Sequence, residues 1–170
     1  KMKSEETIFI VAGSIPNKRS TPLVDEWFGL QYENGKFVKS LSMNELLAHT
    51  GFRSTKIPNS ANLTEADVAA AEGLLPDAVE HAKKYLDGYY QSYQSHINPL
   101  LDEELDKLAE LETRHKYYQL SLFESERKKS EQERMVDELF DKFTTWVTDT
   151  MSIQNNPYIR IMAVMKGVTR

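Results

Sequence analysis

Near its end the chain reads Tyr158-Ile-Arg-Ile-Met-Ala-Val164, and near its beginning it reads Thr7-Ile-Phe-Ile-Val-Ala12. Both runs are rich in β-branched and apolar residues and predict strands. The continuous apolar character after Arg160 favours a central strand beside the first one. Because almost the whole chain separates the two runs, the sequence predicts a sheet in which both ends of the chain meet.

A hairpin is predicted next to the first strand. Residues 23–32 and 36–41 flank Asn34-Gly35, a dipeptide that accepts positive φ at both central positions of a type I′ turn. Residues 14–22 contain two prolines and several turn formers, which indicates a loop. The hairpin and the two terminal runs together predict a small, mostly antiparallel sheet.

Two short helices follow the hairpin. Ser42 with Glu45 forms a capping box and Gly51 ends the first helix, while Thr64 is the predicted N-cap of a second helix that runs to Gly73. The residues between them, 52–62, are rich in Pro, Asn and Ser and predict a loop.

A long helical stretch fills residues 76–151, and Asn98-Pro99 interrupts it once. The leucines and aromatic residues after Pro99 recur every three or four positions, which is typical of a packed helix pair. We therefore expect one helix over residues 76–96 and another from Pro99, forming a hairpin that turns near Asn98. This arm would project from the sheet, with His96, Ile97 and Leu100 at its tip.

The end of the helical stretch has two distinct parts. Residues 124–134 contain no apolar side chain and either stay helical through i,i+4 charge pairs or bend there. Residues 135–147 then restore a wide apolar face, which we expect the sheet lobe to cover.

Composition limits the function classes. The chain has 170 residues, 40% apolar and 28% charged, with a net charge of −5 and no cysteine. This balance is typical of a soluble domain, and we expect a cytoplasmic location and no membrane contact. The early strand after Lys1 favours a piece of a longer protein. Acidic residues concentrate on the helices, whereas both ends of the chain carry a basic excess.

No catalytic or metal motif is present in the sequence. The chain lacks a phosphate loop, a dinucleotide fingerprint, a nucleophile elbow and a His-Glu-x-x-His motif. Glu112-Thr-Arg-His115 is half of a di-iron motif, but no second Glu-x-x-His exists, so we interpret His115 as structural. We expect no catalytic residue, no metal and no cofactor in this segment.

Four loop cations are the candidates for contact with phosphates: Lys18, Arg19, Arg53 and Lys56. They lie in two Ser/Thr-rich loops, where hydroxyl donors and positive charges meet phosphate groups readily. The simpler interpretation is that they keep these loops hydrated. The tyrosines of the long helices have helical spacing beside leucines, which favours packing over base stacking.

Several stretches resemble the C-terminal region of bacterial Swi2/Snf2-type helicases, which include RNA-polymerase-associated remodelling ATPases. They are Pro22-Leu-Val-Asp-Glu-Trp-Phe-Gly-Leu30, Ser42-Met-Asn-Glu-Leu-Leu47, Arg134-Met-Val-Asp-Glu-Leu-Phe-Asp141 with Trp146, and Asn156-Pro-Tyr-Ile-Arg-Ile-Met-Ala-Val164. None of them is a catalytic signature. The resemblance implies that two ATP- and Mg²⁺-dependent motor lobes lie upstream of these residues.

The sequence thus predicts one α+β domain, 1–170, with a sheet lobe of residues 1–62 and 135–170 and a helical arm of residues 63–134. We expect an accessory domain of an ATP-dependent DNA helicase or translocase, which positions the motor on duplex DNA or on a protein partner. The alternative is a coiled-coil module for protein binding or self-association without a nucleic-acid role. The four loop cations would serve the first hypothesis, and the arm would serve protein contact in either.

Overall fold

The computed structural model describes residues 2–52, 64–120 and 126–167. The chain divides into two compact units. The first comprises residues 1–15, 22–90 and 155–170, and the second comprises residues 16–21 and 91–154. Among the described residues, no helix is long and apolar enough to span a membrane.

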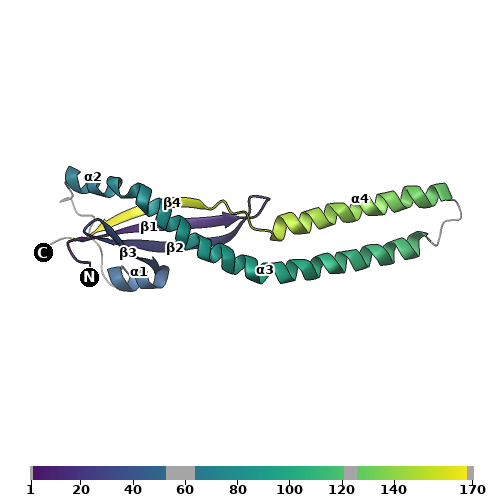
Figure 1. Ribbon diagram of the computed structural model, residues 1–170, viewed down its shortest axis with the longest axis horizontal. Helices are drawn as coiled ribbons and strands as arrows, with labels where there is room; N and C mark the ends of the chain where they lie inside the picture. Colours follow the sequence, from purple (N-terminus) through teal and green to yellow (C-terminus); the bar gives the residue numbers. More distant parts are fainter. Residues whose placement is uncertain (1, 53–63, 121–125, 168–170) are drawn as a thin grey trace. The chain divides into compact units, whose positions relative to one another are not determined.

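Four strands form one sheet in the order β3-β2-β1-β4. Their bounds are β1 Glu6–Pro16, β2 Pro22–Glu33, β3 Lys36–Ser42 and β4 Tyr158–Lys166. β1 pairs antiparallel with β4, and Phe9 lies opposite Val164. The strands from the two ends of the chain are therefore neighbours, as Figure 1 shows, and the expected α+β fold is confirmed.

The place of β4 in the sheet differs from the expectation. We expected a central strand, but β4 is an edge strand of the described sheet. Only part of its apolar run is buried. Met165 packs on the core cluster of Ile8 and Leu41, whereas Tyr158 and Met162 are exposed. An apolar run cannot by itself distinguish these two positions, because both bury part of the strand.

The hairpin between β2 and β3 forms as predicted. Asn34 has a φ of 50° and Gly35 a φ of 74°, so both central residues lie in the left-handed region that a type I′ turn requires. Glu33 lies opposite Lys36 on either side of the turn. The expected loop at residues 14–22 is shorter than predicted, because β1 continues to Pro16 and β2 begins at Pro22.

Both short helices have the predicted caps. Ser42 and Glu45 form a capping box at α1 (Met43–Thr50), and Gly51 ends the helix in the left-handed conformation. Thr64 caps α2 (Glu65–Gly73) and forms a second capping box with Asp67. The predicted loop between the helices lies outside the described residues, apart from Phe52.

The long helix α3 (Leu75–Leu120) covers one face of the sheet with its first turns. The Tyr85 ring lies 4.2 Å from the Phe28 ring, and the Tyr32 hydroxyl donates to Asp77 at 2.7 Å. Burial and this hydrogen bond raise the pKa of Tyr32. A Cβ at Gly13 would lie 2.6 Å from Leu86, so a glycine allows the close approach of β1 and α3.

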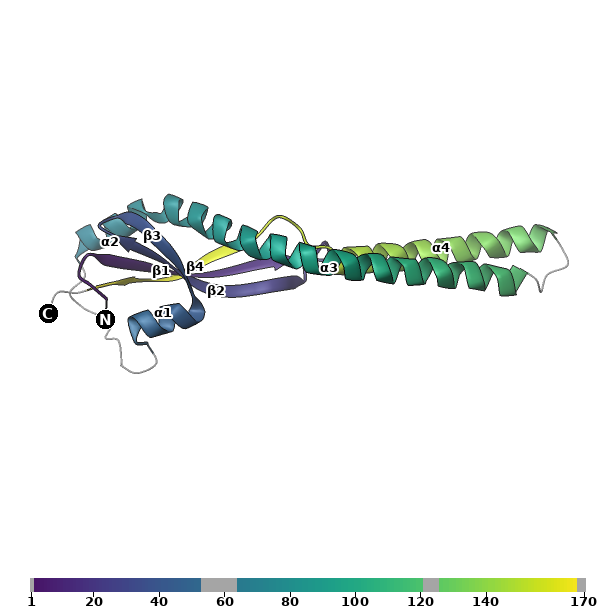
Figure 2. The same ribbon diagram turned by 60° about the horizontal axis from the view of Figure 1, so that its bottom comes forward.

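The opposite face of the sheet is covered in part by α1. Leu46 of α1 packs with Ile8 and Leu41, and all three are buried. Figure 2 shows α1 and the first half of α3 on opposite sides of the sheet. The core of the first unit therefore consists of a sheet between two helical layers.

The helical hairpin near Asn98 was a wrong prediction. α3 continues through Asn98-Pro99 as one helix, and its antiparallel neighbour is α4 (Glu126–Met151), which lies beside it in both views (Figures 1 and 2). A proline inside a helix removes one backbone hydrogen bond at a cost of about 3 kcal/mol. Contacts with α4 along the following turns offset this cost, so the helix continues instead of turning.

The leucine pattern after Pro99 was assigned to the wrong partner. Leu101, Leu105 and Leu108 are half-buried. They face α4, not the preceding residues of the same helix. The polar residues at the start of α4 are helical, with Arg134 3.7 Å from Glu138 at i,i+4 spacing, which confirms one of the two alternatives for that stretch.

Candidate functional site

Two of the four predicted phosphate contacts lie in the turn between β1 and β2. The buried Asn17 holds this turn, because its Oδ1 accepts hydrogen bonds from the backbone N–H groups of Arg19 and Thr21 at 2.9 Å. Its Nδ2 donates to the carbonyl of Thr150 at 2.9 Å. Lys18 Nζ lies 3.7 Å from the Asp149 carboxylate, so a carboxylate already neutralises part of its charge.

The other predicted contacts are not assembled with these. Arg53 and Lys56 lie outside the described residues. His96, Ile97 and Leu100 lie within α3 and not at the tip of a hairpin, since the connection between α3 and α4 comes at residues 121–125. The tip was misplaced because Asn98-Pro99 was interpreted as a turn. His96 and Leu100 are exposed on α3, and Ile97 is half-buried, so all three stay candidates for protein contact along the helix and not at a tip.

The second unit has one apolar side. We expected α4 to be part of the sheet lobe, but it belongs to the second unit, together with the second half of α3. Four large apolar residues of α4 are 46–61% exposed: Met135, Leu139, Phe143 and Trp146. Their i, i+4, i+8 and i+11 spacing places them on one line of the helix.

This line does not face α3. Val136, Phe140 and Val147 are buried or half-buried and form the line of α4 that packs on α3. At about 100° per residue, the exposed line is offset from the packed line by about 90°. The apolar arc of α4 is therefore wider than one neighbouring helix covers.

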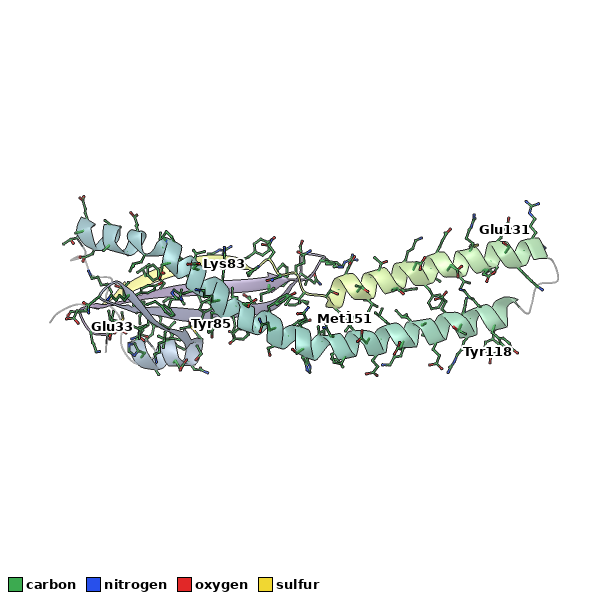
Figure 3. The ribbon with its side chains drawn as sticks, in the orientation of Figure 1. Glu33, Lys83, Tyr85, Tyr118, Glu131 and Met151 are labelled. Atoms are coloured by element: carbon green, nitrogen blue, oxygen red, sulfur yellow. The ribbon has the colours of Figure 1, made fainter. Side chains whose placement is uncertain are left out.

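A matching line lies on α3. Leu100, Leu111 and Tyr118 are exposed, and they are offset by about 90° from the line of Leu101 and Leu108 that faces α4. The offset has the same rotational sense in both helices. Because the two helices run in opposite directions, offsets of the same rotational sense place the exposed line of α3 and the exposed line of α4 on the same side of the pair. Figure 3 marks Tyr118 near the end of α3, opposite the first turns of α4.

We call these seven side chains the apolar face. They are Leu100, Leu111 and Tyr118 of α3 and Met135, Leu139, Phe143 and Trp146 of α4.

The opposite side of the helix pair is ionic. Lys116 Nζ lies 2.5 Å from Asp137 of α4 and 2.7 Å from Glu112 of its own helix. Hydrogen bonds to Asp137 first, and then to Glu112, raise the pKa of Lys116. On each helix, the charged residue (Asp137 on α4, Lys116 on α3) and the exposed apolar residues lie on opposite sides of the line that packs against the other helix. On α4 the apolar and charged residues therefore lie on different sides, whereas on α3 the ion pair of Glu104 and Lys107 lies between Leu100 and Leu111 on the exposed line.

His115 has the structural place that the sequence suggested. Its ring lies 6.2 Å from the Phe140 ring, between the two helices. Among the described residues, no group of three His, Asp or Glu side chains is close enough to hold a metal ion. The acidic cluster at Asp102–Asp106 is exposed, and Lys107 bonds its Glu103 and Glu104.

The tyrosines divide into two groups. Tyr85 and Tyr89 pack beside each other and beside Phe28, which confirms the packing interpretation for the first part of α3. Tyr117 and Tyr118 are 75% and 68% exposed, so the same interpretation is wrong at its end. Helical spacing located both groups on a face but could not show which face would be covered.

Two hollows among the described residues lie in the first unit. One, of about 410 Å³, is lined by Ile15, Lys83, Lys84, Leu86, Asp87, Tyr90 and residues 155–157. The other, of about 440 Å³, lies between α2, the hairpin turn and β4. Lys166 bonds Asp67 at its edge, and this bond, followed by those from Thr64, lowers the pKa of Asp67. Sequence reasoning missed Lys83 and Lys84 because nothing in their spacing distinguishes them from other helix-surface lysines.

A buried carboxylate lies on the α1 side of the sheet. Glu6 is 1% exposed, and its Oε1 accepts hydrogen bonds from His49 Nε2 at 2.5 Å and from Gln31 Nε2 at 2.6 Å. Its Oε2 accepts from the backbone N–H of Lys3 at 3.0 Å. Both oxygens accept hydrogen bonds within the protein, so this cluster is a satisfied structural hydrogen-bond network.

The chain matches none of the protein-family models, curated proteins or solved structures with which it was compared.

Proposed function

We propose that this chain is a non-catalytic interaction module that binds a protein partner through the apolar face of α3 and α4. One observation carries the proposal: four adjacent large side chains of α4 are about half exposed along a single line. Exposed apolar surface of this extent is unfavourable in water and is typical of a surface that a partner covers. The aromatic residues Phe143 and Trp146 are the types that dominate binding energy in protein interfaces.

The module hypothesis includes the accessory role that the resemblance to Swi2/Snf2-type helicases implies. In that role the apolar face would position a motor on a protein partner. The module would need no cofactor of its own, because binding through apolar side chains requires none.

Site-specific photo-crosslinking tests the proposed surface. A photoreactive amino acid replaces Phe143 in cells that make the chain, and we expect an adduct with one defined protein, identified by mass spectrometry. The matched control replaces Thr144, the next residue, which is exposed and points away from the apolar face. Equal adducts from both positions, or none from Phe143, would overturn the proposal.

We propose contact with duplex DNA as a second function, on the basis of Lys83 and Lys84. Both line the 410 Å³ hollow of the first unit, together with the side chains of Asn155 and Asn156, and Figure 3 marks Lys83 on α3. Lysine and asparagine donate hydrogen bonds to phosphate oxygens. This surface is distinct from the predicted loop cations and is less acidic than the second unit.

Duplex binding is expected to weaken at least tenfold when Lys83 and Lys84 are both replaced by alanine. The slope of log K against log salt should fall by about 2, because each lost phosphate contact contributes about 1. Fluorescence anisotropy with a labelled duplex measures both the affinity and its dependence on salt. Lys36→Ala, an exposed lysine at the hairpin turn, is the control. Unchanged affinity in the double variant would remove the DNA proposal but leave the protein-binding proposal intact.

A further inference from the structure

We infer that the partner covering the apolar face is a second copy of this chain, and that the two helix pairs form an antiparallel four-helix bundle. The inference rests on the proposed function, because it uses the same surface. Two-fold association buries the same face of each copy and needs no other protein. Bundles of this type pack two apolar helix pairs face to face.

The arrangement follows from the levels of residues along the helix pair. Lys116 is level with Asp137, and His115 with Phe140, as their contacts show. Because the helices are antiparallel, each step back along α3 corresponds to a step forward along α4. Leu111 is therefore level with Phe143, and Tyr118 is level with Met135. A two-fold axis parallel to the helices keeps these levels. It places α4 of one copy on α3 of the other, so that Leu111 meets Phe143 and Tyr118 meets Met135 across the interface.

Charges beside the apolar face favour this arrangement. Along the outer edge of α4 lie Glu138, Lys142 and Asp149, and along the outer edge of α3 lie Glu103, Lys107, Glu110 and Arg114, with Lys107 bonded to Glu103 and Arg114 to Glu110. At the levels given above, Arg114 of one copy faces Glu138 of the other. Lys107 likewise faces Asp149. Each contact joins opposite charges.

The alternative two-fold arrangement places α4 on α4. It brings the outer edge of α4, where Glu131, Glu138 and Asp149 outnumber Lys142, against its own copy. Like charges at an interface disfavour that arrangement. The charge pattern therefore selects the α4-on-α3 arrangement.

The area available is sufficient for a stable interface. The exposed surface of the seven side chains is on the order of 700 Å², close to the roughly 800 Å² that each partner buries in a stable complex. Its centre contains the aromatic residues Phe143 and Trp146, and its edges are charged. This distribution is the usual anatomy of a protein interface.

Cysteine cross-linking tests the arrangement without cross-links from native cysteines, because the chain has none. Leu111→Cys and Phe143→Cys are made as separate proteins and oxidised alone and as an equal mixture. We expect a cross-linked dimer containing one chain of each variant in the mixture, at least fivefold above either protein alone. Thr144→Cys, on the other side of α4, is the matched control and should give no cross-link with Leu111→Cys.

Sedimentation equilibrium gives the second measurement. The unmodified chain should have twice the mass of a 19.6 kDa monomer, and Leu139→Glu should weaken association at least tenfold. Leu139 is half exposed in the single chain, so this change leaves the helix pair intact. A cross-link of Phe143→Cys with itself would overturn the arrangement.

The two proposals fail in different ways. A chain that stays monomeric at the highest attainable concentration overturns the inference of a second copy. If the probe at Phe143 still forms an adduct with one identified different protein, the proposed function stands. If no position-specific adduct forms at all, both are overturned.

Discussion

Replacing Phe9 with alanine is expected to lower the free energy of unfolding by about 3–5 kcal/mol. Phe9 is fully buried in the centre of β1, and its ring makes an edge contact with Tyr32 at 5.4 Å. Truncation removes this contact and leaves a cavity in the core between the sheet and α3. Urea denaturation followed by circular dichroism measures the change.

The matched control for this prediction is Val38→Ala on β3. Val38 is 47% exposed, so its truncation should change the free energy of unfolding by no more than about 0.5 kcal/mol. Comparable losses for the two variants would show that Phe9 is not in the core, and would contradict the packing of the first unit.

Replacing His49 with leucine is expected to cost about 3 kcal/mol, because it removes the imidazole that hydrogen-bonds the buried Glu6 carboxylate at 2.5 Å. Glu6 is 1% exposed, whereas His49 is 34% exposed, so the penalty comes from the carboxylate. Gln31 and the Lys3 backbone would remain as neutral donors, which compensate a carboxylate only in part. The same urea denaturation measures the loss.

A double variant separates the charge effect from packing. Glu6→Gln removes the charge but keeps an acceptor for Gln31 and Lys3, so Glu6→Gln with His49→Leu should recover most of the stability lost in His49→Leu. If the double variant is as unstable as the single one, the loss arises from the packing of His49, and its hydrogen bond to the Glu6 carboxylate does not account for it.

Local signals in the sequence predicted several elements well. Asn34-Gly35 specified the hairpin because only a few residue types accept positive φ at both turn positions. Ser42 with Glu45, Gly51 and Thr64 specified helix ends because caps depend on residues within one turn. The pairing of the two terminal strands was also predicted, from their composition.

The course of α3 depended on distant residues. Asn98-Pro99 normally favours a turn, and its local cost is real. Only the packing of α4 on the turns after Pro99, fixed at Lys116 and Asp137, shows that the helix continues. The position of the tip of the helix pair therefore could not be derived from the residues near Pro99.

The candidate surfaces were predicted less well than the fold. The sequence identified Met135, Leu139, Phe143 and Trp146 as an apolar face but could not show whether the rest of the chain covers it. Lys18 was a candidate for phosphate contact, and its proximity to Asp149, far along the chain, was invisible in the sequence. Charge and periodicity are properties of single elements, whereas exposure is a property of their packing.

The sequence by itself determined the α+β class, the hairpin, the helix caps and the meeting of both ends in one sheet. These features depend on backbone preferences and on periodic burial, which short segments encode. The tertiary structure alone decided that β4 is an edge strand, that α3 passes through Pro99, and that one side of the helix pair is apolar and open. The physical reason is that each of these depends on which distant side chains remove a surface from water.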